Sequence, residues 1–294
     1  MKFAYRIAHL SDLHLMVENR DYESCLALVE DAAAQGADHL IISGDLVESG
    51  EMKVLRAFVA ALKKLGWAGS RRVTIVPGNH DIFPFTKRKF PTIYRRPTSI
   101  FNEFNAITRG SRTGKGFRSL QSGAVYPFGK ILNEQVVLVG LDTTRNGAFN
   151  PFNWAGGELT GEQMLATEQF FSDWRHIPNR IIVMHHPPWK EAFVGGSWFE
   201  QNFIRPTPEE VFEWIQISSA TLVVCGHVHR SDGIEIKSGG TRQTILRAGT
   251  AGGVDEGVGG DKKRTYHLID LNPKNTVKIH TREFQDRDLW PWGE

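Results

Sequence analysis

The chain contains little cysteine and no long hydrophobic stretch. Its two cysteines, Cys25 and Cys225, lie 200 positions apart in 294 residues. This excludes a disulfide scaffold and indicates a reducing compartment. No apolar run approaches the roughly 18 residues that a membrane span requires. Asp12 interrupts the N-terminal sequence before a signal-peptide core can form. We therefore expect a cytoplasmic globular protein without a transmembrane segment.

Acidic residues are scarce in one segment, although the whole chain has a formal net charge of only +2. Residues 82–130 contain ten basic residues, nine aromatic residues and a single acid, Glu103, so the segment has a net charge of +9. The basic residues are Lys87, Arg88, Lys89, Arg95, Arg96, Arg109, Arg112, Lys115, Arg118 and Lys130. This basic aromatic-rich insertion is either a solvated face or a lid or cleft for an anionic ligand.

Short apolar runs alternate with amphipathic stretches, which predicts an α/β fold. Six runs have the length and composition of buried strands: Tyr5–Leu10, His39–Ile42, Val73–Val76, Val136–Leu141, Arg180–Met184 and Thr221–Cys225. Helices are predicted over Asp21–Gln35, which ends before Gly36, and over Glu51–Leu65, where apolar residues recur every three or four positions. After Gly226 the pattern changes to that of β-hairpins.

Polar clusters directly follow five of the six apolar runs. They are Ser11-Asp12-Leu13-His14, Gly44-Asp45, Gly78-Asn79-His80-Asp81, His185-His186-Pro187 and Gly226-His227-Val228-His229. In open α/β sheets, ligands bind beyond the carboxyl ends of the strands, so the five clusters should meet at one surface. A spacing of two, as between Asp12 and His14, would place both side chains on one side of an extended chain.

These clusters supply seven oxygen or nitrogen donors and no thiolate: Asp12, His14, Asp45, Asn79, His185, His227 and His229. Seven ligands are too many for one ion, whereas a carboxylate such as Asp45 can bridge two. The donor types suit manganese, iron, cobalt or zinc, and the absence of cysteine argues against a structural zinc site. Two adjacent transition-metal cations can activate a bridging water for in-line phosphoryl displacement.

The order of these motifs resembles that of the calcineurin-like metallophosphoesterase superfamily, over Asp12 to His229. The sequence motifs Gly-Asp-Leu, His-His-Pro-Pro and Gly-His-Val-His are most similar to those of bacterial class III cyclic-nucleotide and glycerophosphodiester phosphodiesterases. The resemblance implies a single domain over residues 1–294. Its expected fold is a four-layer α/β/β/α sandwich with mixed sheets and a C-terminal β-hairpin region.

The resemblance also implies a role for each residue of the clusters. Asp12, His14 and His229 would bind one metal, and Asn79, His185 and His227 the other. Asp45 would bridge two divalent or trivalent ions, for which manganese, iron and zinc remain open. His80 would bind the phosphate and protonate the leaving oxygen as a general acid, and Asp81 would orient His80.

Departures from better-known family members favour a phosphodiester substrate. Protein serine/threonine phosphatases have an Asp-Arg pair where Glu48 and Ser49 stand here, so the arginine clamp for a phosphate dianion is missing. Purple acid phosphatases place an iron-binding tyrosine at the Glu48 position, and UDP-diacylglucosamine pyrophosphatases usually have arginine at the His80 position. We expect hydrolysis of a small or medium phosphodiester by a metal-bridging hydroxide, with His80 as the acid.

An alternative function follows from the basic segment. Clustered cations and aromatic side chains in residues 82–130 also suit a nuclease, or a protein that binds nucleic acid or anionic lipid. The sequence does not decide the oligomeric state.

Overall fold

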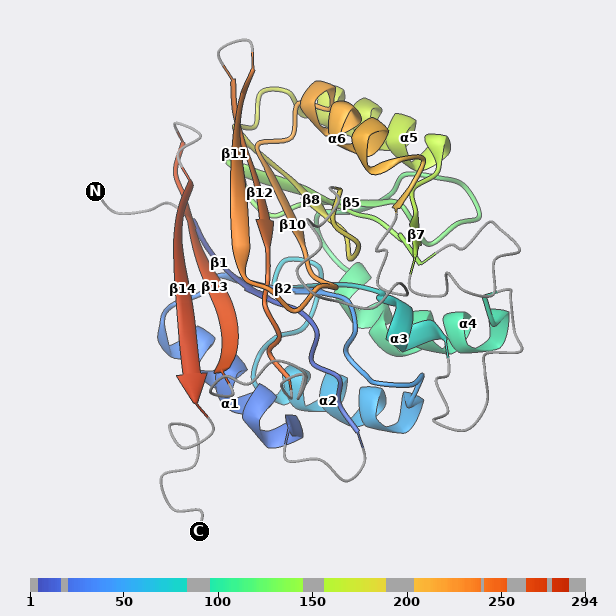
Figure 1. Cartoon of the computed structure of the whole chain (residues 1–294), viewed down its shortest axis with the longest axis vertical. Coiled ribbons are helices and arrows are strands. Elements are labelled where there is room, and N and C mark those ends of the chain that lie inside the picture. The colour runs from blue at the N-terminus through green and yellow to red at the C-terminus, as the bar shows by residue number, and fades with distance from the viewer. Residues whose placement is uncertain are drawn as a thin grey trace, which may run out of the picture.

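A computed structural model of the chain describes residues 5–16, 21–83, 96–144, 156–188, 204–238, 241–252, 263–273 and 277–285. Two β-sheets lie face to face, and helices cover the outer face of each sheet (Figure 1). Three groups of buried hydrophobic side chains fill the three interfaces between these layers. The structure therefore confirms the expected α/β/β/α sandwich with mixed sheets.

The first sheet is built around three parallel strands from the first part of the chain. Strand β1 (Tyr5–Leu10) pairs with β2 (His39–Ser43), which pairs with β3 (Val73–Val76). On the other side of β1 lies a C-terminal antiparallel hairpin of β13 (Lys263–Leu271) and β14 (Val277–Gln285). The carboxyl ends of the three parallel strands therefore lie together at one edge of the sheet.

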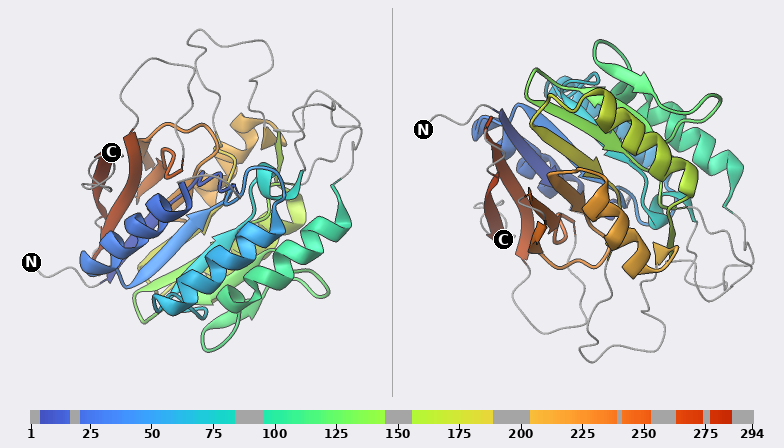
Figure 2. Two further views of the ribbon diagram at one scale, coloured as in Figure 1. Left: turned by 90° about the horizontal axis from the view of Figure 1, so that it is seen from below. Right: turned by 90° about the horizontal axis from the view of Figure 1, so that it is seen from above.

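Helices α1 (Asp21–Ala34) and α2 (Met52–Lys64) cover the outer face of this sheet (Figure 2). In α2 the side chains of Leu55, Phe58 and Leu62 are spaced along one face and are buried against the strands. Because this spacing matches the helical period, the sequence predicted both helices to within one residue at each end.

The second sheet has seven strands in the order β11-β12-β10-β8-β6-β5-β4. Its parallel centre consists of β6 (Val136–Gly140), β8 (Asn179–Val183) and β10 (Leu222–Cys225). Strand β12 (Thr241–Arg247) pairs parallel with β10, and β11 (Asp232–Ser238) forms a hairpin with β12 at the edge. The carboxyl ends of β8 and β10 again lie at one edge.

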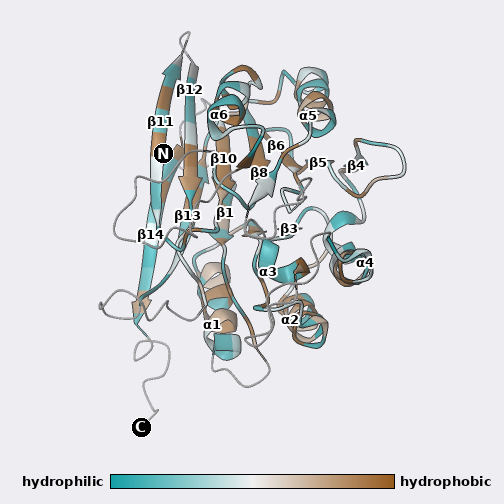
Figure 3. Cartoon of the chain, turned by 45° about the vertical axis from the view of Figure 1, so that its right-hand side comes forward, coloured by the Kyte–Doolittle hydropathy of each residue, from teal (hydrophilic) through white to brown (hydrophobic). Residues whose placement is uncertain are grey.

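Helices α5 (Gly161–Asp173) and α6 (Pro208–Ile217) cover the outer face of the second sheet. Both begin at a threonine, Thr160 and Thr207, whose hydroxyl oxygen accepts a hydrogen bond from a backbone N–H of the first turn. Figure 3 shows that hydrophobic residues dominate the strands between the helical layers. The hydrophobic core therefore lies on both faces of the central strands of each sheet.

Part of the basic segment belongs to the body of the domain. Helix α4 (Thr98–Ile107) packs beside α2 and leads into the short 3-10 helix η1 (Thr108–Arg112). Strands β4 (Phe117–Ser119) and β5 (Phe128–Ile131) then extend the second sheet beyond β6. In the described part of 82–130, β4 and β5 therefore belong to the sandwich, because their backbone hydrogen bonds are made within the second sheet. The expected lid or cleft stays a prediction, since residues 84–95 lie outside the described residues.

Two further elements lie near the carboxyl ends of the second sheet. Strands β7 (Gly157–Glu158) and β9 (Ile204–Arg205) form a short parallel pair, and α3 (Asn79–Ile82) is a single turn after β3. Among the helices that the structure describes, none has the length and apolar composition of a membrane span.

Candidate metal centre

The polar clusters predicted from the sequence meet at the carboxyl ends of both sheets. Asp12, His14, Asp45, His227 and His229 share an unusual feature there, since each has a positive φ, between 45° and 80°. Among the described residues, only one other non-glycine residue has a positive φ. This left-handed conformation costs a non-glycine residue about 1–2 kcal/mol, and such strained residues cluster at functional sites.

The positive φ values change the explanation for the Asp-x-His spacing. We expected an extended chain to place Asp12 and His14 on one side, but both residues leave the extended conformation. Their backbone N–H groups donate to Gly44 and Asp45 carbonyls, so the loop after β1 is held against the loop after β2. The side chains of Asp12 and His14 do lie together in one donor group, but a left-handed backbone at both residues brings them there.

The first donor group consists of Asp12, His14 and His229. His14 Nε2 lies 2.9 Å from His229 Nε2, and His229 Nε2 lies 3.5 Å from Asp12 Oδ1. Ligands bonded at 2.0–2.2 Å to one transition-metal ion are separated by roughly 3–3.5 Å. The group therefore has the spacing that one cation requires.

The second donor group lies on the other side of Asp45. His185 Nε2 lies 3.1 Å from both Asp45 Oδ2 and Asn79 Oδ1. His185 Nδ1 donates to the Ser43 carbonyl at 2.8 Å, which leaves the Nε2 lone pair directed at the two oxygens. This geometry supports the choice of His185, rather than His186, as the ligand.

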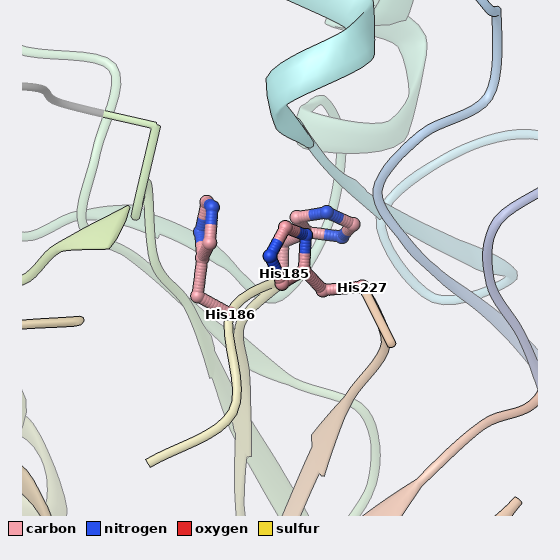
Figure 4. Close-up of side chains that lie close together, drawn as sticks. All are labelled: His185, His186 and His227. Carbon is pink, nitrogen blue, oxygen red and sulfur yellow. The ribbon is translucent and has the colours of Figure 1, made fainter. Parts of the chain in front are cut away.

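His227 lies beside His185 of this second group. Its ring lies beside His185 and His186, with ring centroids 5.0 Å and 4.5 Å away (Figure 4). These three histidines form a further possible ligand group that the sequence had not predicted. His186 Nδ1 also contacts the Thr143 hydroxyl at 2.8 Å, so the His186 ring is held against the loop after β6.

Asp45 belongs to two of the donor groups. One contains Asp12 and His185, and the other contains His14 and His80. This shared position fits the expectation that Asp45 bridges two ions. Burial would raise the pKa values of Asp12 and Asp45, but the neighbouring histidines outweigh it and lower both. Both carboxylates are therefore ionised at neutral pH and suited to cations.

Two motif glycines permit this close packing. A Cβ atom on Gly44 would lie 2.4 Å from His185 Nδ1, and one on Gly78 would lie 2.1 Å from Asp45 Oδ1. Any side chain at either position would displace a donor, which explains the Gly-Asp and Gly-Asn sequences physically.

His80 lies next to the donor groups and contacts Glu48. His80 Nδ1 lies 2.9 Å from the Glu48 carbonyl oxygen and 3.5 Å from its carboxylate, while its backbone N–H donates to Asp45. Burial would lower the pKa of His80, but the charges of Asp45 and Glu48 raise it to about 9. The ring is therefore a proton donor at neutral pH.

Glu48 also contacts His14, through a distance of 2.6 Å between Oε2 and Nδ1. Hydrogen bonds to both histidines overcome the effect of burial and lower the pKa of Glu48 to about 2. In the sequence alone, Glu48 is only a difference from other families. Glu48 follows Asp45 by only three residues, and this short spacing could have indicated that Glu48 contacts the histidines of the site.

The hydrogen bonds described for Asp81 are to the backbone, and its expected role in orienting the His80 ring stays a prediction. The Asp81 carboxylate accepts hydrogen bonds from the backbone N–H groups of Val47 and Gly78, at 3.0 and 2.9 Å. Asp81 therefore fixes the two loops that hold Asp45 and Asn79, and Glu48 makes the contact with the ring. Burial and the nearby Asp45 charge raise the pKa of Asp81 to about 7.

The cations of 82–130 do not form one cleft in the described structure. Lys130 is fully buried and donates to Val73 and Thr74, and Arg112 is 6% exposed. Arg96 forms an ion pair with Asp142. The remaining described cations, Arg109, Lys115 and Arg118, are exposed, and Lys87, Arg88, Lys89 and Arg95 lie outside the described residues. Lys130 and Arg112 are therefore too buried to contact an anionic ligand at the surface.

The fold and the paired donor groups define the class as a metal-dependent hydrolase of phosphate esters. The family model for calcineurin-like phosphoesterases matches residues 5–231, and the chain belongs to this family. A comparison with curated proteins gave no match.

Solved structures with the same fold include two phosphatases. A dimetal phosphatase from Danio rerio has a TM-score of 0.62 and 12% identity, over 97% of this chain and 99% of that one. A purple acid phosphatase from yellow lupin (Lupinus luteus) seeds has a TM-score of 0.58 and 12% identity, over 97% of this chain and 55% of that one. At this identity the likeness concerns the fold.

Proposed function

We propose that this phosphoesterase hydrolyses a small or medium phosphodiester at a centre of two transition-metal ions. The observation that carries the proposal is the composition of the turn after Asp45. Glu48 holds the proton donor His80, while Ser49 stands where an arginine would clamp a phosphate dianion. In the described structure no arginine or lysine forms an ion pair with Asp12 or Asp45. The site thus suits a substrate phosphate with a single negative charge.

The donor set fits two such ions, because the oxygen and imidazole ligands form two groups that meet at Asp45. When bound, a pair of these cations supplies the Lewis acidity for in-line displacement at phosphorus. Asp12, His14 and His229 would hold one ion. Asn79, His185 and His227 would hold the other, with Asp45 shared.

The remaining steps belong to side chains of this chain. His80 carries a proton at neutral pH and donates it to the leaving oxygen as the ester bond breaks. Glu48 holds His80 through Nδ1, so that Nε2 is the nitrogen that faces the substrate. The same carboxylate holds His14 and thus joins the acid to the first metal site.

A substrate panel tests the proposal. Under manganese, a bis-aryl phosphate, cyclic AMP and glycerophosphodiesters should be turned over faster than an aryl phosphate monoester. A Ser49→Arg variant should raise the ratio of monoester to diester turnover, and Asp45→Ala should abolish both activities and so exclude a contaminant. Monoester turnover far above diester turnover in the unmodified protein would contradict the proposal.

A further inference from the structure

Two segments without acidic residues run through the sandwich and meet at the end opposite the metal centre. Residues 52–80 contain six cations, residues 104–133 contain five, and neither segment contains Asp or Glu. Ser70 joins them, because its N–H donates to the Thr113 carbonyl at 2.9 Å and its hydroxyl donates to the Lys115 carbonyl at 2.7 Å. Cations distant in the sequence therefore lie on one surface.

Nine of these cations are exposed. Six of the nine form what we call the basal basic face: Lys63, Lys64, Arg71, Arg72, Arg109 and Lys115. They come from the last turn of α2, the turn before β3, η1 and the loop that follows it. Figure 2 shows the end of α2 and the loop after η1 side by side in both views.

The negative charges beside this face lie near two of its edges. Glu103 on α4 is paired with Arg56, and the exposed Asp38 lies beside Arg72, whose guanidinium donates to the Asp38 carbonyl. The side chains of Lys63, Lys64, Arg109 and Lys115 have no ion-pair partner among the described residues. Unpaired cations on one surface raise the local concentration of polyanions.

The face is separate from the metal centre. It lies at the amino end of β3, whereas Asn79 follows its carboxyl end. At about 3.3 Å per strand residue, the two are roughly 15–20 Å apart. An anion bound there cannot place the same phosphate at the donor groups, so the face is a second site.

We infer that the basal basic face binds the phosphate backbone of nucleic acid, independently of the metal centre and of its substrate. Within the described residues it lacks the apolar anchors of a membrane surface, since the exposed large hydrophobics are Met16, Val125, Leu165, Ile217 and Ile234. Its one tryptophan, Trp67, is buried under Arg72 and offers no stacking surface for bases. Binding therefore proceeds through phosphates and is independent of base sequence.

Binding of a labelled duplex DNA, measured by fluorescence anisotropy over a salt series, tests the inference. Affinity should fall steeply with salt, and Lys64→Glu/Lys115→Glu should weaken binding about tenfold or more and flatten the salt slope. The control Arg175→Glu/Lys237→Glu makes the same charge change on other exposed surfaces and should bind like the unmodified protein. Both variants should keep their turnover of a small diester, which shows that they are folded.

Three results would overturn the inference. The first is absence of DNA binding at low salt, and the second is equal loss of binding in the control variant. The third is tighter binding to phosphatidylglycerol vesicles than to DNA, which would assign the face to a membrane. Since diester turnover is measured separately, failure of this inference is distinguishable from failure of the proposed function.

Discussion

The carboxylate of Glu48 lies 2.6 Å from Nδ1 of His14 and thereby determines which nitrogen of that ring can bind a cation. With Nδ1 engaged, Nε2 faces His229 Nε2 at 2.9 Å. A carboxylate behind a ligating histidine fixes the tautomer and raises the basicity of the ligand. Because Glu48 also contacts His80, it would join metal binding to proton donation in the proposed mechanism.

Replacing Glu48 with Gln should weaken the first metal site and lower turnover together. The amide keeps the shape but loses the charge, and such changes behind a ligand typically cost 10–100-fold in affinity or activity. Manganese titration by calorimetry and steady-state kinetics would measure both effects. The matched control is Glu103→Gln, which removes an exposed carboxylate of α4. Unchanged manganese affinity in Glu48→Gln would contradict this role.

Replacing His80 with Ala should lower kcat about 10²–10⁴-fold and leave the metal content unchanged, because His80 donates a proton and the seven donors remain. The loss should be smaller for aryl esters, whose leaving groups need little protonation, than for alkyl esters. Kinetics with the two ester types and elemental analysis would measure this. An equal loss with both leaving groups, or lost metal, would show that His80 has another role.

Replacing Asp45 with Ala should remove both ions, since this carboxylate belongs to donor groups on both sides. Elemental analysis after dialysis would measure the metal content, and circular dichroism would confirm folding. Asp142→Asn is a suitable control, because Asp142 is equally buried but is paired with Arg96 outside the donor groups. A folded Asp45→Ala variant that retains two ions would rule out the bridge.

His39 should make the fold sensitive to acid. Burial, and to a lesser extent Lys130, lower the pKa of His39 from 6.5 to about 3. The unfolded chain therefore binds a proton that the folded protein excludes. The resulting penalty is absent above pH 6.5 and grows by at most about 1.4 kcal/mol per pH unit as the pH falls towards 3.

Chemical denaturation at several pH values would measure this effect. A His39→Asn variant should lose less stability than the unmodified protein between pH 6.5 and about 4.5, whatever its stability at pH 8. His176→Asn, at an exposed position, should follow the unmodified protein. Parallel curves for His39→Asn and the unmodified protein would show that His39 is not the group responsible.

The central strands and the polar clusters at their ends were predictable because local sequence determines both. Strands such as β1 and β3 are short apolar runs, and the sequence gives their bounds without error. Their ends carry the donor residues, and the parallel arrangement brings such ends together. Local patterns alone therefore predict the parallel centre of each sheet and the position of the site.

Other features depend on contacts between distant residues. The sequences of β4 and β5 lack a strong apolar alternation. These strands form because β5 pairs with the edge of β6, and β4 then pairs with β5. Lys130 counts as a surface cation in the sequence, but the opposite sheet buries it against Thr74. The contact between Glu48 and His80 likewise depends on two loops that meet only in the folded chain.

Two of the donor groups draw residues from both sheets: Asp12 and His14 follow β1 and meet His229 beyond β10, while Asp12 and Asp45 meet His185 beyond β8. No fragment limited to one half of the polypeptide can assemble these two groups. A cation held by either group would therefore be bound only after the two sheets have docked. Such a cation would link the halves as a crosslink would, and its removal by a chelator should loosen the sandwich at this end first.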